Sequence, residues 1–253
     1  MNILISGANS GLGRQLAISY AAQGVNLFLC ARNLIKLEEV KAICLELKAN
    51  VFIKSLDVKN AAEVAQWVEK IEENYALNLV IANAGISAGT SGGTESAQQV
   101  REIFATNVDG VINLVGPVAE KMKMRGHGQI AVMASLAGFR GLPSSPAYSA
   151  SKAAVRVYGE ALRGNLGEFG IKVSVICPGY VKTPMTAVNS FYMPFLLSVE
   201  KAAMIIKKGL AKNHSRVAFP FPLYFVVWLA TLLPPCLTDF IFARLPKKSA
   251  MGD

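Results

Sequence analysis

The chain has 253 residues, of which 52% are hydrophobic and 17% are charged, so disordered and fibrous proteins are excluded. Its 26 lysines and arginines against 17 aspartates and glutamates give a net charge of +9, which favours anionic partners. The basic residues are scattered, which argues against nucleic-acid binding, and the two histidines are too few for a histidine-rich metal site. A phosphorylated molecule or an acidic membrane surface is the partner that these numbers favour.

The cysteines, at positions 30, 44, 177 and 236, lie far apart and form no Cys-x-x-Cys pair. We expect reduced thiols in a reducing compartment. The first residues lead directly from a short apolar run into a glycine-rich turn, without the pattern of a signal peptide. A cytoplasmic location is therefore expected.

Short apolar runs alternate with longer amphipathic stretches over roughly the first 180 residues. The runs are apolar at nearly every position, which is typical of central strands in a parallel sheet covered on both faces. Strands that alternate with helices indicate βαβ units, and hence an α/β fold with a doubly wound parallel sheet between two helical layers. We expect strands at 3–5, 25–30, 51–55, 77–81, 129–133 and 172–176, and helices that include 34–48 and 61–74.

A glycine-rich turn, Ser6-Gly7-Ala8-Asn9-Ser10-Gly11-Leu12-Gly13, follows the first predicted strand and precedes a helix that begins near Arg14. Its glycines lack Cβ atoms where a backbone turns tightly against a phosphate, and the free N–H groups of a helix start attract anions. The spacing G-x-x-x-G-x-G differs from the general G-x-G-x-x-G fingerprint. An ordinary tight loop is the alternative, but the position after the first strand favours a pyrophosphate site.

The second predicted strand ends in Ala31-Arg32-Asn33, and the first acidic residue after it is Glu38. A free ribose 2′-hydroxyl usually meets an acidic residue about 20 residues on, whereas a 2′-phosphate needs a cation. The planar Arg32 guanidinium can pair with a phosphate through two bonds; a solvated surface side chain is the alternative. The missing acid favours a 2′-phosphorylated cofactor in either case.

Tyr148 and Lys152 stand four residues apart in a segment that Ser145 and Pro146 predict to begin a helix. Residues at this spacing lie on one helix face. A nearby cation favours the phenolate and suits the phenol to general acid/base catalysis nearer neutral pH. Such pairs are common by chance, and alone this one is more consistent with a surface or core position.

Three further polar residues strengthen the candidate site. Ser135 ends the fifth predicted strand, thirteen residues before Tyr148, and Asn83 ends the fourth. Asn107 lies in Thr106-Asn107-Val108-Asp109. Ligands of open α/β sheets bind beyond the carboxyl ends of the strands, so we expect Ser135 and Asn83 at the edge where the glycine-rich turn lies.

Together these residues resemble the short-chain dehydrogenase/reductase family in its compact single-domain form. The resemblance covers roughly residues 1–185 and implies a Rossmann fold and an NADP(H)-dependent oxidoreductase. Ser6 stands where the family usually has threonine, and Ala82 where a second asparagine is frequent. The motifs are residues 6–13, Asp57, Asn83-Ala84-Gly85, Ser135 with Tyr148 and Lys152, and Pro178-Gly179 followed by Thr183.

The resemblance implies a catalytic role for four residues. Tyr148 would donate the proton to the substrate carbonyl oxygen. Lys152 would lower the pKa of Tyr148 and bind the nicotinamide ribose. Ser135 would hydrogen-bond to the carbonyl, and Asn107 would hold a water in the proton relay behind Lys152.

It also implies the residues that bind the cofactor, and no metal is called for. Asp57 and Val58 would contact the adenine, and the Ala31-Arg32 ending of the second strand generally accompanies NADP. The other cofactor-binding residues would be Gly7, Asn9, Ser10, Gly11, Leu12, Gly13, Asn83, Gly85, Tyr148, Lys152, Pro178, Gly179, Val181 and Thr183.

The C-terminal segment departs from relatives that reduce acyl-carrier-protein thioesters, which usually end in a glycine-rich strand. Here residues 217–245 read VAFPFPLYFVVWLATLLPPCLTDFIFARL. Pro222 and Pro234 delimit a helix of about 12 residues, roughly 18 Å long, which is too short for a bilayer core of about 30 Å. We therefore expect a catalytic domain at 1–216 and, within the same domain, a hydrophobic extension at 217–253 that acts as a lid, a dimer contact or a membrane-associating segment.

The extension predicts an apolar pocket mouth and a lipophilic carbonyl or alcohol substrate. The leading hypothesis is an NADP(H)-dependent carbonyl reductase, and a homodimer through the long helices after the fourth and fifth strands is implied by the resemblance. One alternative is a membrane-associated lipid reductase of 3-ketosphinganine or steroid type, helped by Lys247 and Lys248; another is a non-catalytic NADPH-sensing module. Side chains expected to flank the cleft are Phe139, Phe191, Tyr192, Met193, Phe195 and Leu196.

Overall fold

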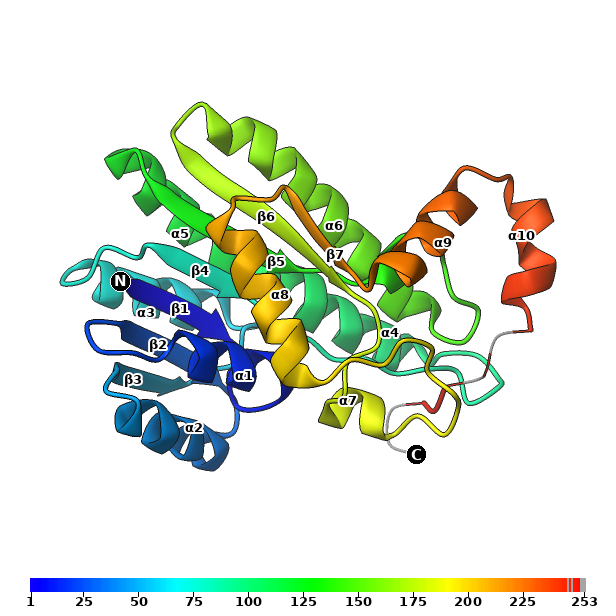
Figure 1. The fold of residues 1–253 in the computed structure, drawn as a ribbon, viewed down its shortest axis with the longest axis horizontal. Helices are drawn as coiled ribbons and strands as arrows, with labels where there is room; N and C mark the ends of the chain where they lie inside the picture. The colour runs from blue at the N-terminus through cyan, green and yellow to red at the C-terminus, as the bar shows by residue number, and fades with distance from the viewer. Residues whose placement is uncertain (245, 247, 251–253) are drawn as a thin grey trace.

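The computed structural model describes residues 1–244, 246 and 248–250. A parallel sheet of seven strands in the order β3-β2-β1-β4-β5-β6-β7 runs through the molecule (Figure 1). This confirms the doubly wound sheet expected from the sequence. The strands are β1 (Asn2–Ser6), β2 (Asn26–Ala31), β3 (Asn50–Ser55), β4 (Leu79–Ala82), β5 (Gly128–Met133), β6 (Ile171–Pro178) and β7 (Arg216–Phe219).

Helices cover both faces of the sheet, because successive strand residues point to opposite faces and both sets are apolar. Leu4 and Phe28 belong to one buried cluster, and Ile3 and Leu27 belong to the other. The first cluster lies against α3 (Ala61–Glu72), α5 (Gly110–Arg125) and α6 (Pro146–Gly167). The second lies against α1 (Gly11–Tyr20), α2 (Leu34–Glu46) and α8 (Val199–Ala211), which completes three layers.

Three short helical segments lie in the connections between the longer elements. A π-helix, η1 (Ala105–Asp109), joins α4 (Ala97–Phe104) to α5, and a 3₁₀ turn, η2 (Leu136–Gly138), follows β5. The short helix α7 (Pro184–Ala187) follows β6.

Strand β7 is an element that sequence reasoning missed. It is only four residues long, and it pairs in parallel with the end of β6, for example Ile176 with Val217. The expected boundary between residues 216 and 217 therefore falls inside β7. So short a run carries too little periodicity to be separated from the apolar segment after it.

The C-terminal extension forms two helices, α9 (Phe221–Thr231) and α10 (Pro235–Phe242), at one end of the molecule (Figure 1). One side of α9 packs on the core through Leu223, Tyr224 and Val227. Arg140 binds α10 through an ion pair with Asp239, at 2.6 Å. Within the described residues, no helix combines the length and the apolar character needed to cross a bilayer. Leu245 and Lys247, which belong to the expected extension, lie outside the described residues.

Candidate active site

The glycine-rich turn joins β1 to α1, and its glycines are needed for close packing. Gly7 has φ of +65°, and a Cβ there would lie 2.8 Å from Ala84 Cα. A Cβ on Gly13 would overlap the carbonyl oxygen of Gly7. Helix α1 begins at Gly11 instead of near Arg14, and the Ser10 side chain does not cap it. The first N–H groups of α1 thus have no capping side chain and suit an anion.

Ser6 and Asn83 join the ends of β1 and β4 beneath this turn. The Ser6 hydroxyl accepts hydrogen bonds from the backbone N–H groups of Asn83, at 3.0 Å, and Ala84, at 3.1 Å. The Asn83 amide donates to the Ser6 carbonyl at 2.9 Å. A hydroxyl at position 6 therefore fixes the spacing of the two strand ends.

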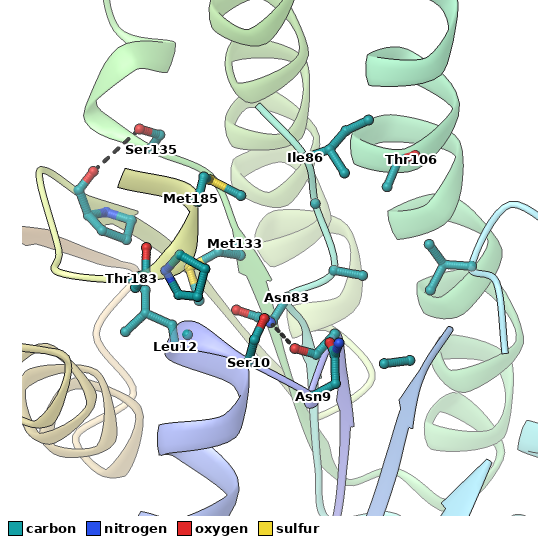
Figure 2. Close-up of a pocket in the computed structure, with 18 of the residues that line it drawn as sticks. Asn9, Ser10, Leu12, Asn83, Ile86, Thr106, Met133, Ser135, Thr183 and Met185 are labelled. Atoms are coloured by element: carbon teal, nitrogen blue, oxygen red, sulfur yellow. Dashed lines mark hydrogen bonds between the residues drawn. The ribbon is translucent and has the colours of Figure 1, made fainter. Parts of the chain in front are cut away.

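A cavity of about 510 Å³ opens above these strand ends, and Figure 2 shows residues that line it. Every cofactor-binding or catalytic residue expected from the sequence lines it except Gly13 and Asn107. Gly13 lies beneath the turn, against Gly7, and Asn107 is fully buried behind the wall. One continuous cavity thus connects the glycine-rich turn with Ser135, Tyr148 and Lys152.

One end of the cavity is lined by Ala31, Arg32, Asp57 and Val58. The Arg32 side chain is exposed and has no carboxylate partner among the described residues. The Asp57 carboxylate accepts a hydrogen bond from the backbone N–H of Lys59 at 3.0 Å, which holds it at the strand end. This end of the cavity thus combines an exposed guanidinium with a fixed carboxylate.

At the other end, the side chains of Ser135 and Tyr148 both line the cavity. Ser135 Oγ also accepts from the Ala137 N–H at 3.1 Å and donates to the Pro178 carbonyl at 3.4 Å, drawn in Figure 2. Burial raises the pKa of the Tyr148 phenol, although the hydrogen bond to Ser135 lowers it in part. This direction is opposite to the lower pKa expected from the Tyr-x-x-x-Lys spacing, because burial is its largest cause.

Lys152 is 3% exposed, and its ammonium donates to the Met133 carbonyl oxygen at 2.8 Å. The ammonium lies 5.8 Å from the centre of the Tyr148 ring. Burial lowers the pKa of Lys152 to about 8. The ammonium is therefore still charged at neutral pH and lies close enough to influence the phenol.

Asn107 is placed behind Lys152 by the π-helix η1, an irregularity that often occurs at functional sites. Its amide donates to the Ile86 carbonyl at 2.9 Å and to Ser151 Oγ at 3.0 Å, and its oxygen accepts from the Ile86 N–H at 2.8 Å. A Cβ on Gly85 would lie 3.1 Å from Asn107 Oδ1 and 3.3 Å from Lys152 Nζ. Gly85 therefore leaves space between the asparagine and the lysine.

Several lining residues were not found from the sequence. Ile86 follows β4 and Met133 ends β5, as the rule for open sheets would have indicated, whereas Thr106 lies on η1 and Met185 on α7. Thr183 and Thr186 form a capping box on α7, which brings Thr183 against Gly11. The additional lining residues labelled in Figure 2 are Ile86, Thr106, Met133 and Met185.

The aromatic cluster expected at the cleft does not line the cavity. Phe139 packs edge-on against Tyr224, with 5.5 Å between ring centres, and Arg156 lies 4.8 Å from its centre. Tyr192 is 86% exposed. The members that the cavity does not include are Phe139, Phe191, Tyr192, Met193, Phe195 and Leu196.

We compared the chain with models of protein families and with curated proteins. A model of the short chain dehydrogenase family matches residues 1–191. An uncharacterized oxidoreductase of Myxococcus xanthus is 37% identical over 243 residues, which cover 96% of each chain.

Solved structures share the fold. A short-chain dehydrogenase from Sphingobium yanoikuyae in complex with NADPH superposes with a TM-score of 0.81 at 23% identity, covering 99% of this chain and 98% of that one. A short chain dehydrogenase/reductase from Burkholderia phymatum in complex with NAD has a TM-score of 0.81 at 24% identity, with 97% and 96% covered. These two neighbours share the fold and differ in the nicotinamide cofactor bound to them.

Proposed function

The chain belongs to the short chain dehydrogenase family, and we propose that it is an NADP(H)-dependent oxidoreductase that interconverts lipophilic carbonyl compounds and alcohols. One observation carries the proposal: a single cavity joins an anion-binding turn to a tyrosine, a serine and a buried lysine. A purely structural role, or nucleotide binding alone, does not require Tyr148, Ser135 and Lys152 to lie together in this cavity.

The residues present fit a phosphorylated dinucleotide. The first residues of α1 line the cavity, where their N–H groups would bind a pyrophosphate, and Asp57 and Val58 would flank the adenine. Arg32, exposed and without a carboxylate partner among the residues described, would bind a 2′-phosphate. When bound, the nicotinamide would supply the hydride.

The protein's own groups would supply and direct the proton. Tyr148, whose pKa is raised by burial, stays protonated at neutral pH and would donate its proton to the substrate oxygen. Ser135, which lines the same cavity as the phenol, would orient that oxygen. The charged Lys152 would stabilise the phenolate left behind, and Asn107 would hold a water that reprotonates it.

Apolar groups near the reacting end support a lipophilic substrate. Met133, Met185 and Ile86 line the cavity there. Helix α9 also reaches this region, since a Cβ on Gly179 would lie 3.0 Å from the Leu223 side chain. A substrate that leaves the cavity toward α9 would meet an apolar surface.

The proposal is tested by following NADPH oxidation against aliphatic, steroidal and long-chain ketones, with NADH in parallel. We expect turnover of at least one apolar series and a preference for NADPH. Tight NADPH binding without turnover of any carbonyl compound would contradict the proposal and would favour the NADPH-sensing alternative.

A second candidate is a reductase of membrane lipids, and the surface of α9 and α10 favours it. We propose that this surface contacts an anionic bilayer from the cytoplasmic side, consistent with the net charge of +9. Lys247, which the sequence also places beside this surface, lies outside the described residues. The exposed apolar side chains are Phe221, Phe225, Val226, Trp228, Leu229, Leu232, Leu233, Leu237, Phe240 and Ile241.

Two organisational proposals accompany this function. Residues 1–216 would form the catalytic part and 217–253 its hydrophobic extension. A homodimer would form through α4, α5 and α6, whose surfaces expose Ile112 and Val157 at 45% and 54%. Sedimentation velocity of the wild type and of Val157→Glu tests the dimer, which the charge should dissociate.

A further inference from the structure

The last described residues return to the reacting end of the cavity. They bind the loop at Gly89–Ser91 through their backbone. The Gly89 N–H donates to the Ser249 carbonyl at 2.6 Å, and the Ser91 N–H donates to the Lys248 carbonyl at 2.9 Å. A Cβ on Gly89 would overlap the Lys248 backbone, so a glycine is needed where the tail docks. The tail is thus held by directed backbone hydrogen bonds at Lys248 and at the residue after it.

This docking places the Lys248 side chain against the catalytic tyrosine. Its ammonium donates to Ser87 Oγ at 2.5 Å and lies 5.4 Å from the centre of the Tyr148 ring. Lys152, on α6, lies at a similar distance of 5.8 Å. Ser87 follows Ile86, and both Ile86 and Tyr148 line the cavity, so Lys248 contacts the ring of one lining residue and the neighbour of another.

Lys248 has no carboxylate partner among the described residues. Glu95, the acidic residue connected to the same loop, accepts hydrogen bonds from the Ala147 N–H and from Gln99, which in turn binds the Gly89 carbonyl. Burial lowers the pKa of Lys248 to about 8. A half-buried cation without an anion has lost hydration that a negatively charged ligand would replace.

We propose that Lys248 is a specificity-determining residue that binds an anionic group of the substrate, a carboxylate or a phosphate. The substrate class is then a lipophilic ketone or aldehyde that carries this group a few bonds from its carbonyl. The inference rests on the proposed function, since it places the carbonyl at Tyr148. The apolar remainder of the substrate would extend toward Met185 and α9, and the anion would lie between the tail and Tyr148.

The first test compares three ketones of equal chain length in NADPH oxidation: 2-oxododecanoate, 2-oxododecyl phosphate and the neutral 1-hydroxy-2-dodecanone. We expect wild-type kcat/KM to be higher for an anionic probe than for the neutral one. Lys248→Met should reduce that ratio on the order of tenfold or more, and Lys248→Arg should retain most of it. The carboxylate and phosphate arms show which anion fits.

Two further variants control this result. Lys70→Met removes an exposed lysine from α3 and the same unit of charge, so it should leave the ratio unchanged. Lys248→Gln keeps a polar end without charge and should behave as Lys248→Met does. An anionic-to-neutral ratio of kcat/KM that is unchanged in Lys248→Met would overturn the proposal. So would an equal rise in kcat/KM for all three ketones, which would indicate a tail that obstructs the site.

A binding measurement separates this inference from the proposed function. Calorimetry on the NADPH-loaded protein compares dodecanoate and dodecyl phosphate with dodecanol, none of which can be reduced. We expect an anion to bind on the order of tenfold more tightly than dodecanol, and Lys248→Met to lose this preference. If no ketone is turned over but this preference depends on Lys248, the oxidoreductase proposal fails and the anion site stands. If ketones are turned over without any such preference, the anion site fails alone.

Discussion

The central sheet and the C-terminal helices are both rich in apolar residues, but they differ in what covers these residues. Ile3, Leu27 and Val132 in the sheet are fully buried, whereas Phe221 and Phe240 in α9 and α10 are 70% and 63% exposed. An apolar run therefore indicates a hydrophobic face without indicating its partner. In the sheet that partner is a helix of the same chain, and in the extension the described residues do not provide one.

The two regions also divide the chemistry. Ser135 and the glycine-rich turn follow the carboxyl ends of buried strands, and α6 brings Tyr148 and Lys152 to the same cavity. The extension and the tail reach the same cavity from outside, through Leu223 near Gly179 and Lys248 near Tyr148. We infer that the sheet determines the reaction and that the C-terminal region determines the substrate.

The largest effect on cofactor affinity is expected from Gly13→Ala, which tests the glycine-rich turn. The added Cβ would overlap the Gly7 carbonyl and force the turn apart, so NADPH affinity should fall on the order of a hundredfold. Fluorescence titration with NADPH measures it. Gly164→Ala, where a Cβ meets open space in α6, is the matched control and should bind NADPH normally. Equal affinities in the two variants would contradict the assigned role of the turn.

The next effect concerns the pH dependence of carbonyl reduction. The pKa of Lys152 is lowered to about 8, so its positive charge is lost as the pH rises through that value. Tyr148, whose pKa is raised, remains protonated over this range. The rate should therefore fall above pH 8, by about tenfold for each pH unit.

Initial rates from pH 6 to pH 10 with a neutral ketone test this profile. The decline should persist in Lys248→Met, although the pKa of Lys248 is also lowered to about 8. A rate that stays constant to pH 10, or a decline that disappears with Lys248, would show that Lys152 does not control the reaction.

The glycine-rich turn could be predicted from the sequence, whereas the direction of the Tyr148 pKa shift could not. The central strands and the glycine-rich turn could be predicted because each is a local pattern of apolar residues or glycines. Strand β7 could not, because Val217 and Phe219 are its only buried apolar positions apart from the partly buried Ala218. The sign of the Tyr148 pKa shift was missed because burial is a property of the folded packing and not of the Tyr-x-x-x-Lys spacing.

Lys248 was missed for another reason. Its position depends on backbone hydrogen bonds to a loop more than 150 residues earlier in the chain, as the Lys248–Ser87 separation of 161 shows. No local pattern encodes such a contact. The residues of the candidate site that the sequence revealed are those held by the sheet, and the residue it did not reveal is held by the tail.

A smaller effect is expected from Arg32→Ala. Loss of the guanidinium at the adenosine end should raise the KM for NADPH about tenfold, because a charge-assisted pair with the 2′-phosphate is lost. The measurement is made at low salt, since salt screens the charge of an exposed side chain. The KM for NADH should change little. Arg101→Ala on α4, which removes another exposed arginine, is the control. An equal rise in KM for both cofactors would argue against 2′-phosphate recognition.

The smallest effect concerns the exposed extension. Replacing Phe225 and Trp228, whose rings lie 6.1 Å apart on α9, by serine should lower the fraction that co-sediments with anionic vesicles several-fold. NADPH affinity should be retained. Ile35→Ser on α2, which is 76% exposed and outside the extension, is the control. Wild-type protein that stays in the supernatant at low salt would contradict a bilayer contact and leave a lid or a dimer surface as the role of α9.

The central claim is that Tyr148 supplies the proton to a carbonyl compound next to a bound nicotinamide. It is tested most directly by the kcat of NADPH oxidation in Tyr148→Phe, with NADPH affinity measured on the same preparation. We predict unchanged or slightly altered NADPH affinity and a kcat lower by a factor of about 10²–10⁴. A Tyr148→Phe protein that binds NADPH and retains full turnover would contradict the account.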